Sequence, residues 1–98
     1  MEDLRFDWDP AKSTANLRKH KVGFEEAATA FLDAHALLID DPEHSAEEDR
    51  FILMGLSGTL RLLLVCHCYR EKAASIRIIS ARKADRLERT LYFARFKP

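Results

Sequence analysis

Hydrophobic and polar positions along the first forty residues predict one strand followed by two helices. Residues 4–8 alternate between apolar and polar side chains, as half-buried strands do. Asp9 before Pro10 is typical of a helix start, because the carboxylate can accept from backbone N–H groups and proline tolerates the first helical position. We predict that this helix runs to about His20 and that a second begins near Gly23. The second helix has one apolar stripe, formed by Phe24, Ala27, Ala28, Phe31 and Leu32.

The rest of the chain has the pattern of a sheet followed by a helix. A polar, acidic loop is predicted over residues 40–49 and a final helix over about residues 83–96. The predicted strands span residues 36–39, 50–57, 60–69 and 75–81. The last three strands are joined by connections too short for a parallel crossover, so we expect antiparallel pairing. The fold class is therefore α+β, with two N-terminal helices, a small mostly antiparallel sheet and one C-terminal helix.

Side-chain periodicity assigns faces within these elements. Along residues 60–69, His67 and its odd-numbered neighbours are expected on the sheet face away from the helices. The residues expected to pack under the helices are Leu62, Leu64, Cys66 and Cys68. The stripe of the final helix that we expect to be buried consists of Ala84, Leu87, Leu91 and Ala94.

Length and composition limit the class of protein. With 98 residues, 47% of them apolar, the chain is sufficient for one domain over residues 1–98 and is not disordered throughout. Its charged start lacks the apolar core of a signal peptide, and no apolar run is long enough to span a bilayer, so we expect a cytoplasmic protein without membrane contacts. Cys66 and Cys68 point the same way in a strand, which disfavours a disulfide and favours a reducing compartment.

The net charge of zero conceals an asymmetry between the two halves of the chain. Residues 1–49 contain five basic and thirteen acidic residues, a net charge of −8, and residues 50–98 contain eleven and three, a net charge of +8. A basic half of this kind favours a polyanionic partner such as nucleic acid, unless folding interleaves the halves and cancels the field.

His67 and Arg77 form the first candidate site. If the loop between their strands has an odd number of residues, the two side chains lie opposite each other on the sheet; an even loop separates them. A guanidinium stabilises charge on a phosphoryl oxygen and an imidazole exchanges protons near neutral pH, so the pair suits phosphate chemistry. The alternative is that His67 is a structural residue of the strand.

Basic residues near the final helix form a second candidate surface. Arg82, Arg86 and Arg89 recur at helical spacing, with Lys83 at the helix entrance. This stripe favours contacts with an RNA backbone, although a solvated helix face has the same pattern. A metal site is not expected, because His67 points away from both neighbouring thiols and no second ligand pair has zinc spacing.

The first helix carries a third group of polar residues along one side. Lys12, Asn16 and Lys19 can contact phosphate and sugar, and His20 can act as an acid or base. The alternative is structural, since a Lys-His pair at the C-terminus of a helix interacts favourably with the helix dipole without any ligand.

Together these residues resemble the BrnT family of ribonuclease toxins over nearly the whole chain. The first half carries the run Phe6–Lys12, then Asn16, Lys19, His20, Val22 and the run Phe24–Ala27. The second half carries Asp41, His44, Glu48, Arg50, Phe51, Gly55, His67, the run Ile76–Ala84, Glu88 and Arg89. Gly23 departs from the family pattern, which has Ser or Thr there, and the lost side-chain cap costs about a few tenths of a kcal/mol.

The resemblance implies a RelE-like fold and an endoribonuclease toxin of a type II toxin–antitoxin pair. We expect the cleavage to need no metal or other cofactor. A ribose 2′-hydroxyl would attack the adjacent phosphorus, with His67 and His20 as acid and base in an order that stays open. The implied charge stabilisers are Lys19, Arg77 and Arg82. The implied RNA-binding residues are Lys12, Lys83, Arg86 and Arg89.

The resemblance also implies a BrnA-like antitoxin. The protein would act on DNA only indirectly, through this antitoxin. Such a partner would carry acidic and apolar residues and bind more weakly at high salt. Two alternatives stay open. The chain would be a non-catalytic module that binds nucleic acid or an acidic partner, or a degenerate toxin that serves as a scaffold for repression by the antitoxin.

Overall fold

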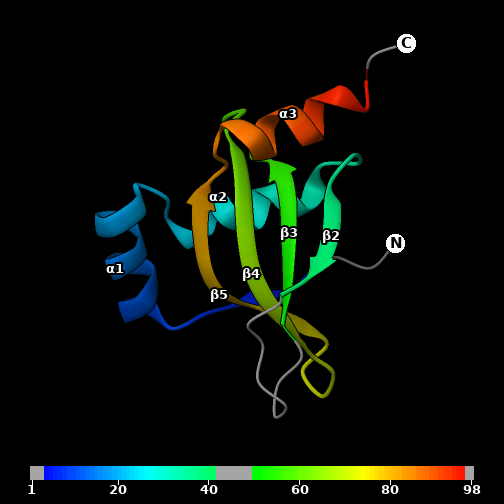
Figure 1. Cartoon of the computed structure of the whole chain (residues 1–98). Coiled ribbons are helices and arrows are strands. Elements are labelled where there is room, and N and C mark those ends of the chain that lie inside the picture. Colours follow the sequence, from blue (N-terminus) through cyan, green and yellow to red (C-terminus); the bar gives the residue numbers. More distant parts are fainter. Residues whose placement is uncertain (1–3, 42–49, 97–98) are drawn as a thin grey trace.

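The chain folds into a mixed sheet with helices on both of its faces (Figure 1). The computed structural model describes residues 4–41 and 50–96. The elements of this part are β1 (Phe6–Asp7), α1 (Pro10–His20), α2 (Phe24–Thr29), the 3-10 helix η1 (Ala30–Leu32), β2 (Leu37–Asp40), β3 (Phe51–Leu56), β4 (Leu62–Arg70), β5 (Ser75–Lys83) and α3 (Arg86–Ala94). In the order β1-β5-β4-β3-β2, β1 pairs parallel with β5 and the other neighbours pair antiparallel. The α+β class and the mostly antiparallel sheet are confirmed.

Local signals set most element boundaries as predicted. The side chain of Asp9 accepts from the N–H of Ala11 at 2.9 Å, and α1 begins at Pro10. β5 runs two residues further than predicted, because Lys83 still pairs with β4, and α3 begins correspondingly later.

Residues 42–49 of the predicted acidic loop lie outside the described residues. None of the helices in the described part of the chain combines the length and the apolar character that crossing a membrane requires.

Two apolar clusters hold the helices on opposite faces of the sheet. The cluster under α2 consists of Val22, Phe24, Ala27, Ala30, Leu53, Leu63, Val65, Ile78 and Ala81. The cluster under α3 consists of Met54, Leu62, Leu64 and Tyr92. The prediction that Leu63 and Val65 lie on a face away from the helices is therefore wrong. Both faces of β4 are apolar. The alternation of side chains along the strand therefore shows which residues share a face, but it does not show which helix covers that face.

α3 packs on the sheet with a different side from the one predicted. Tyr92 is buried, and its hydroxyl donates to Asp33 Oδ2 at 2.5 Å. Burial, together with this hydrogen bond, raises the pKa of Tyr92 to about 12, so the hydroxyl keeps the proton that it donates. Leu87 and Leu91 are exposed instead of buried. The predicted burial is wrong for both leucines, because the tyrosine, which has an apolar ring and a hydrogen-bond partner, orients the helix; Ala84 of the predicted stripe does pack against the cluster under α3.

Candidate functional site

A polar pocket opens on the face of the sheet that α3 partly covers. Its volume is about 300 Å³; residues of β3, β4 and β5 form its floor, and the end of α1 closes one side. The polar residues that line it are His20, Asp41, Arg50, Cys66, Ser80 and Arg82. Two guanidinium groups and an imidazole therefore share one concave site, an arrangement suited to an anionic ligand.

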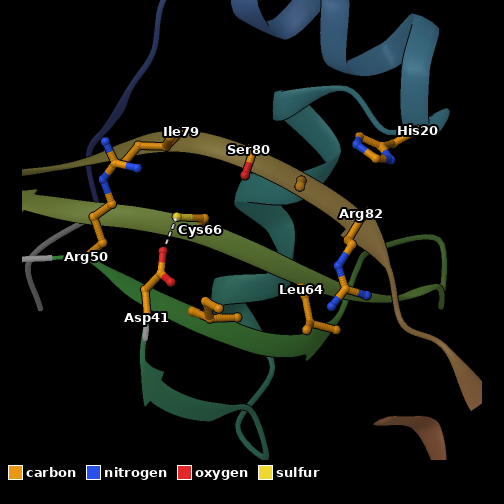
Figure 2. Close-up of a pocket in the computed structure, with 10 residues that line it drawn as sticks. His20, Asp41, Arg50, Leu64, Cys66, Ile79, Ser80 and Arg82 are labelled. Atoms are coloured by element: carbon orange, nitrogen blue, oxygen red, sulfur yellow. Dashed lines mark hydrogen bonds between the residues drawn. The ribbon is translucent and has the colours of Figure 1, made fainter. Parts of the chain in front are cut away.

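The basic groups stand at opposite ends of this pocket (Figure 2). Arg50, which directly precedes β3, extends towards Ile79 at one end. Arg82 of β5 lies at the other end, beside His20 from α1. Ser80 stands between the two ends. A ligand with several charged oxygens can thus be contacted from two sides.

Arg82 is held in place by a carboxylate of α3. Its Nη1 and Nη2 donate to the two carboxylate oxygens of Glu88, each at 2.8 Å. The same carboxylate accepts from the N–H of Asp85, which completes a capping box at the start of α3. The hydrogen bonds that Arg82 donates to Glu88 raise the pKa of Arg82 and lower the pKa of Glu88. The guanidinium is therefore charged and oriented, and its 43% exposed side chain leaves donors for a ligand.

The position of His20 depends on Asn16, one turn earlier in α1. The Asn16 Nδ2 donates to the carbonyls of Val22 at 2.7 Å and Ala81 at 2.8 Å, and its Oδ1 accepts from the N–H of Ala81 at 3.2 Å. The side chain thus takes the place of a neighbouring strand along β5, beyond the end of short β1. The predicted contact of Asn16 with phosphate or sugar is wrong, because the amide is buried and these bonds occupy it. Its structural effect is to fix the end of α1 against β5.

Cys66 is a hydrogen-bond donor in this pocket. Its Sγ donates to Asp41 Oδ2 at 3.4 Å. Burial, together with the neighbouring carboxylate, raises the pKa of the thiol to about 11. Because the thiolate is the nucleophilic form, the protonated thiol is not activated for attack at neutral pH.

The hairpin between β4 and β5 does not place His67 opposite Arg77. Residues 71–74 form its loop, an even number, and Cys68 is the partner of Arg77 while Ile78 is the partner of His67. A register shift between Cys66 and His67 follows in the ladder. The structure therefore follows the alternative in which the two candidate residues are separated.

His67 lies on the face of the sheet that η1 covers. Its ring packs edge-on against Phe31 at a centroid distance of 4.8 Å and near Phe51 at 6.2 Å. Nδ1 lies 2.9 Å from the carbonyl oxygen of Val65, a geometry that a protonated Nδ1 satisfies by donating. The residue is buried, and the predicted position on a helix-free face is wrong. Its surroundings are those of a packed aromatic cluster.

Arg77 is paired at the edge of the sheet, outside the residues that line the pocket. Its Nη1 donates to Asp7 Oδ1 of β1 at 2.6 Å, and the hydroxyl of Ser75 donates to Asp7 Oδ2 at 2.8 Å. Burial acts to raise the pKa of Asp7, but the bonds from Arg77 and Ser75 outweigh it and lower that pKa. The expected grouping of Arg77 with both imidazoles around one pocket is thus wrong: the structure brings together His20 and Arg82.

The other predicted cations are exposed around this site or on the helices. Lys19 precedes His20, Lys83 follows Arg82, and Lys12 lies in the first turn of α1. Sequence reasoning missed Arg50 and Ser80 as site residues. A signal existed for Ser80, because it stands two positions before Arg82 in one strand, where side chains share a face. Arg50 stands among the residues that carry the family resemblance, but its approach to the other site residues depends on the pairing of β3 with β4.

A His67→Phe variant tests the structural role of this buried ring. Burial lowers the pKa of His67 below its ordinary value of 6.5, so the unfolded chain takes up a proton that the folded chain excludes. The wild-type protein should lose stability relative to the variant as the pH falls below about 6.5. Urea unfolding at several pH values measures this difference. A difference that stays constant over the range would contradict the assignment.

Comparisons with known proteins identify the relatives of this chain. The model of a family described as the ribonuclease toxin BrnT of type II toxin–antitoxin systems matches residues 8–88. The crystal structure of the Brucella abortus ribonuclease toxin BrnT matches with a TM-score of 0.64 at 20% sequence identity, covering 86% of this chain and 100% of that one. At this identity the structural likeness concerns the fold. No curated protein sequence matches the chain significantly.

Proposed function

The chain belongs to the BrnT family of ribonuclease toxins of type II toxin–antitoxin systems, and we propose that it cleaves RNA in the pocket of His20, Arg50, Ser80 and Arg82. The observation that carries this proposal is the meeting of an imidazole and two guanidinium groups in one concave site. A phosphodiester bound there would have its charged oxygens between the two arginines, within reach of the His20 imidazole as an acid or base.

The reaction is an internal transesterification of the RNA backbone. The ribose 2′-oxygen attacks the adjacent phosphorus, and the bond from phosphorus to the 5′-oxygen breaks. The 2′-hydroxyl loses a proton and the 5′-oxygen gains one; His20 carries out one of these transfers and solvent water the other. Arg50 and Arg82 stabilise the negative charge that develops on the phosphoryl oxygens, and Ser80 donates a hydrogen bond to one of them. The side chains supply this charge stabilisation themselves, so the reaction needs no metal or cofactor.

Exposed cations extend the site along the RNA backbone. The proposed backbone contacts are Lys19 and Lys83 next to the pocket, Arg86 and Arg89 on α3, and Lys12 on α1. Contacts of this kind position the strand and carry little information about its bases. His67 and Arg77 have no part in this mechanism, because their side chains do not line the pocket.

The family also implies an antitoxin that neutralises the chain. We infer a BrnA-like protein, through which the toxin would act on DNA indirectly, and a cytoplasmic location, where RNA is the accessible substrate. An antitoxin that covers basic groups needed by RNA should carry acidic residues, and its affinity should fall as the salt concentration rises.

Incubation of the purified chain with a short RNA of defined sequence tests the proposal. We expect cleavage in excess EDTA, with 2′,3′-cyclic phosphate and 5′-hydroxyl ends identified by mass spectrometry. A matched RNA with 2′-O-methyl groups should stay intact, because its attacking oxygen is blocked. Ends with a 5′-phosphate, or cleavage that EDTA stops, would contradict the mechanism. RNA that is bound but stays intact would favour a non-catalytic module instead.

A further inference from the structure

The outward side of α3 is an amphipathic surface that the proposed reaction does not explain. Leu87 and Leu91 lie one helical turn apart and are 69% and 57% exposed, while the buried Tyr92 holds the helix on the sheet. Phe93, also on this helix, is 37% exposed. Exposed leucines at this spacing are typical of a surface that packs against another protein, and an RNA backbone offers them no apolar contact.

Basic side chains share the exposed side of α3 with these apolar groups: Arg86 precedes Leu87, while Arg89 and Phe93 lie on the other flank, roughly 120–160° around the helix from the leucines. Arg86 and Arg89 are exposed, and the Arg89 guanidinium lies over the ring of Phe93 at 5.4 Å from its centroid. The carboxylate of Glu88 on the same helix is engaged by Arg82, as described above. We call the set of Arg86, Leu87, Arg89, Leu91 and Phe93 the α3 surface. It combines apolar and positively charged groups, and a complementary partner combines apolar and negatively charged ones.

We propose that the α3 surface is the docking site of the antitoxin, which contributes an acidic amphipathic segment. Apolar side chains of that segment cover Leu87 and Leu91, and its carboxylates pair with Arg86, which lies between the two flanks of the exposed side. This inference rests on the proposed function, which supplies the antitoxin. A second copy of this chain fits less well, because packing two α3 surfaces together would bring arginines of like charge towards each other.

Docking at this surface also accounts for neutralisation of the pocket. Glu88, in the first turn of α3, holds Arg82 in the pocket wall through two hydrogen bonds of 2.8 Å. A segment lying along α3 therefore ends near the pocket. It also occupies Arg86, which the proposed function assigns to the RNA backbone. The antitoxin and RNA consequently compete for this arginine.

A Leu87→Ser/Leu91→Ser double variant of the full chain tests the docking site. The probe is the antitoxin protein produced from the gene paired with this chain, titrated by calorimetry. Loss of two leucines that the antitoxin would bury should weaken binding by about 100-fold, whereas RNA cleavage without antitoxin should stay at the wild-type rate. The matched control is Leu17→Ser on α1, which removes an exposed leucine elsewhere and should bind normally. Arg86→Glu provides a second variant and should weaken binding by about tenfold at low salt.

Several results would overturn the docking site. The first is an antitoxin affinity of the double variant within about twofold of wild type. The second is an equal loss of antitoxin affinity in the Leu17→Ser control. The third is a wild-type protein that forms a dimer in solution, if the double variant abolishes that dimer. A double variant that binds RNA poorly and antitoxin normally would assign the surface to RNA. The binding titration does not depend on catalysis. If RNA stays intact while the double variant loses antitoxin binding as expected, the proposed cleavage is refuted and the docking site stays supported.

Discussion

Replacing Arg82 with alanine should lower kcat/KM for RNA cleavage by about two to three orders of magnitude. The guanidinium lies in the pocket in a fixed orientation, held by Glu88, and its charge opposes the charge that develops as phosphorus becomes pentacovalent. The loss should appear in kcat, because this interaction strengthens as the reaction proceeds. Arg82→Lys should recover part of the rate, since an ammonium keeps the charge but lacks the planar set of donors. Single-turnover cleavage of a short RNA measures both effects.

Arg77→Ala is the matched control for this experiment. Both arginines lie on β5 and each is paired with one carboxylate, Asp7 for Arg77 and Glu88 for Arg82. Each variant therefore loses a comparable ion pair at the surface, which contributes about 0 to 1 kcal/mol to stability. Arg77 does not line the pocket, so cleavage by Arg77→Ala should remain close to the wild-type rate. An equal loss in both variants would contradict the placement of the reaction in this pocket.

Replacing His20 with glutamine should lower kcat by about two to four orders of magnitude. Glutamine has similar reach and still forms hydrogen bonds, but it does not exchange a proton near neutral pH. Single-turnover rates with saturating RNA measure this loss, and an unchanged melting temperature would show that the contacts of Asn16 with β5 tolerate the substitution.

His35→Gln is the control for His20. His35 is exposed and its ring packs edge-on against Phe96 at a centroid distance of 5.0 Å, apart from the pocket. The same chemical change at that position should leave cleavage unaffected. A rise in KM with an unchanged kcat for the His20 variant would show that this imidazole binds RNA without moving a proton, and would refute its role in the mechanism.

Features of the fold that depend on neighbouring residues were predictable. Asp9 and Pro10 start α1 because their effects on the first helical turn are local, and Gly23 precedes α2 for the same kind of reason. Short connections between strands led directly to antiparallel pairing. One domain over residues 1–98 stays a prediction, as do the catalytic and RNA-binding roles of individual residues.

The candidate site was predicted in part. His20 and Arg82 were identified as candidates from their chemistry, and the structure brings them together. Arg77 and His67 were also chosen for their chemistry, but their positions depend on the loop of the β4–β5 hairpin. A change of one residue in such a loop turns every side chain of the paired strand to the other face. Chemistry alone therefore identifies which residues suit a reaction without locating them.

The orientation of α3 shows a second limit of sequence patterns. Leucines at helical spacing predicted the buried side, yet the buried residue is Tyr92, because Asp33 is available to accept from its hydroxyl. A periodic pattern of apolar residues predicts that one side of a helix is buried. Because α3 has apolar residues on two sides, the pattern alone does not select the buried one. The partner of each side is decided by residues far away in the chain.

By itself, the sequence determined the α+β class, the resemblance to the BrnT family and the concentration of basic residues in the second half, since each depends on residue identity, local propensity or spacing. The tertiary structure alone decided that His20, Arg50 and Arg82 share one pocket, that His67 is packed among aromatic rings, and that the leucines of α3 face outward. These features arise from strand register and helix packing between distant segments, where many weak contacts act together and no single short segment of sequence carries the information.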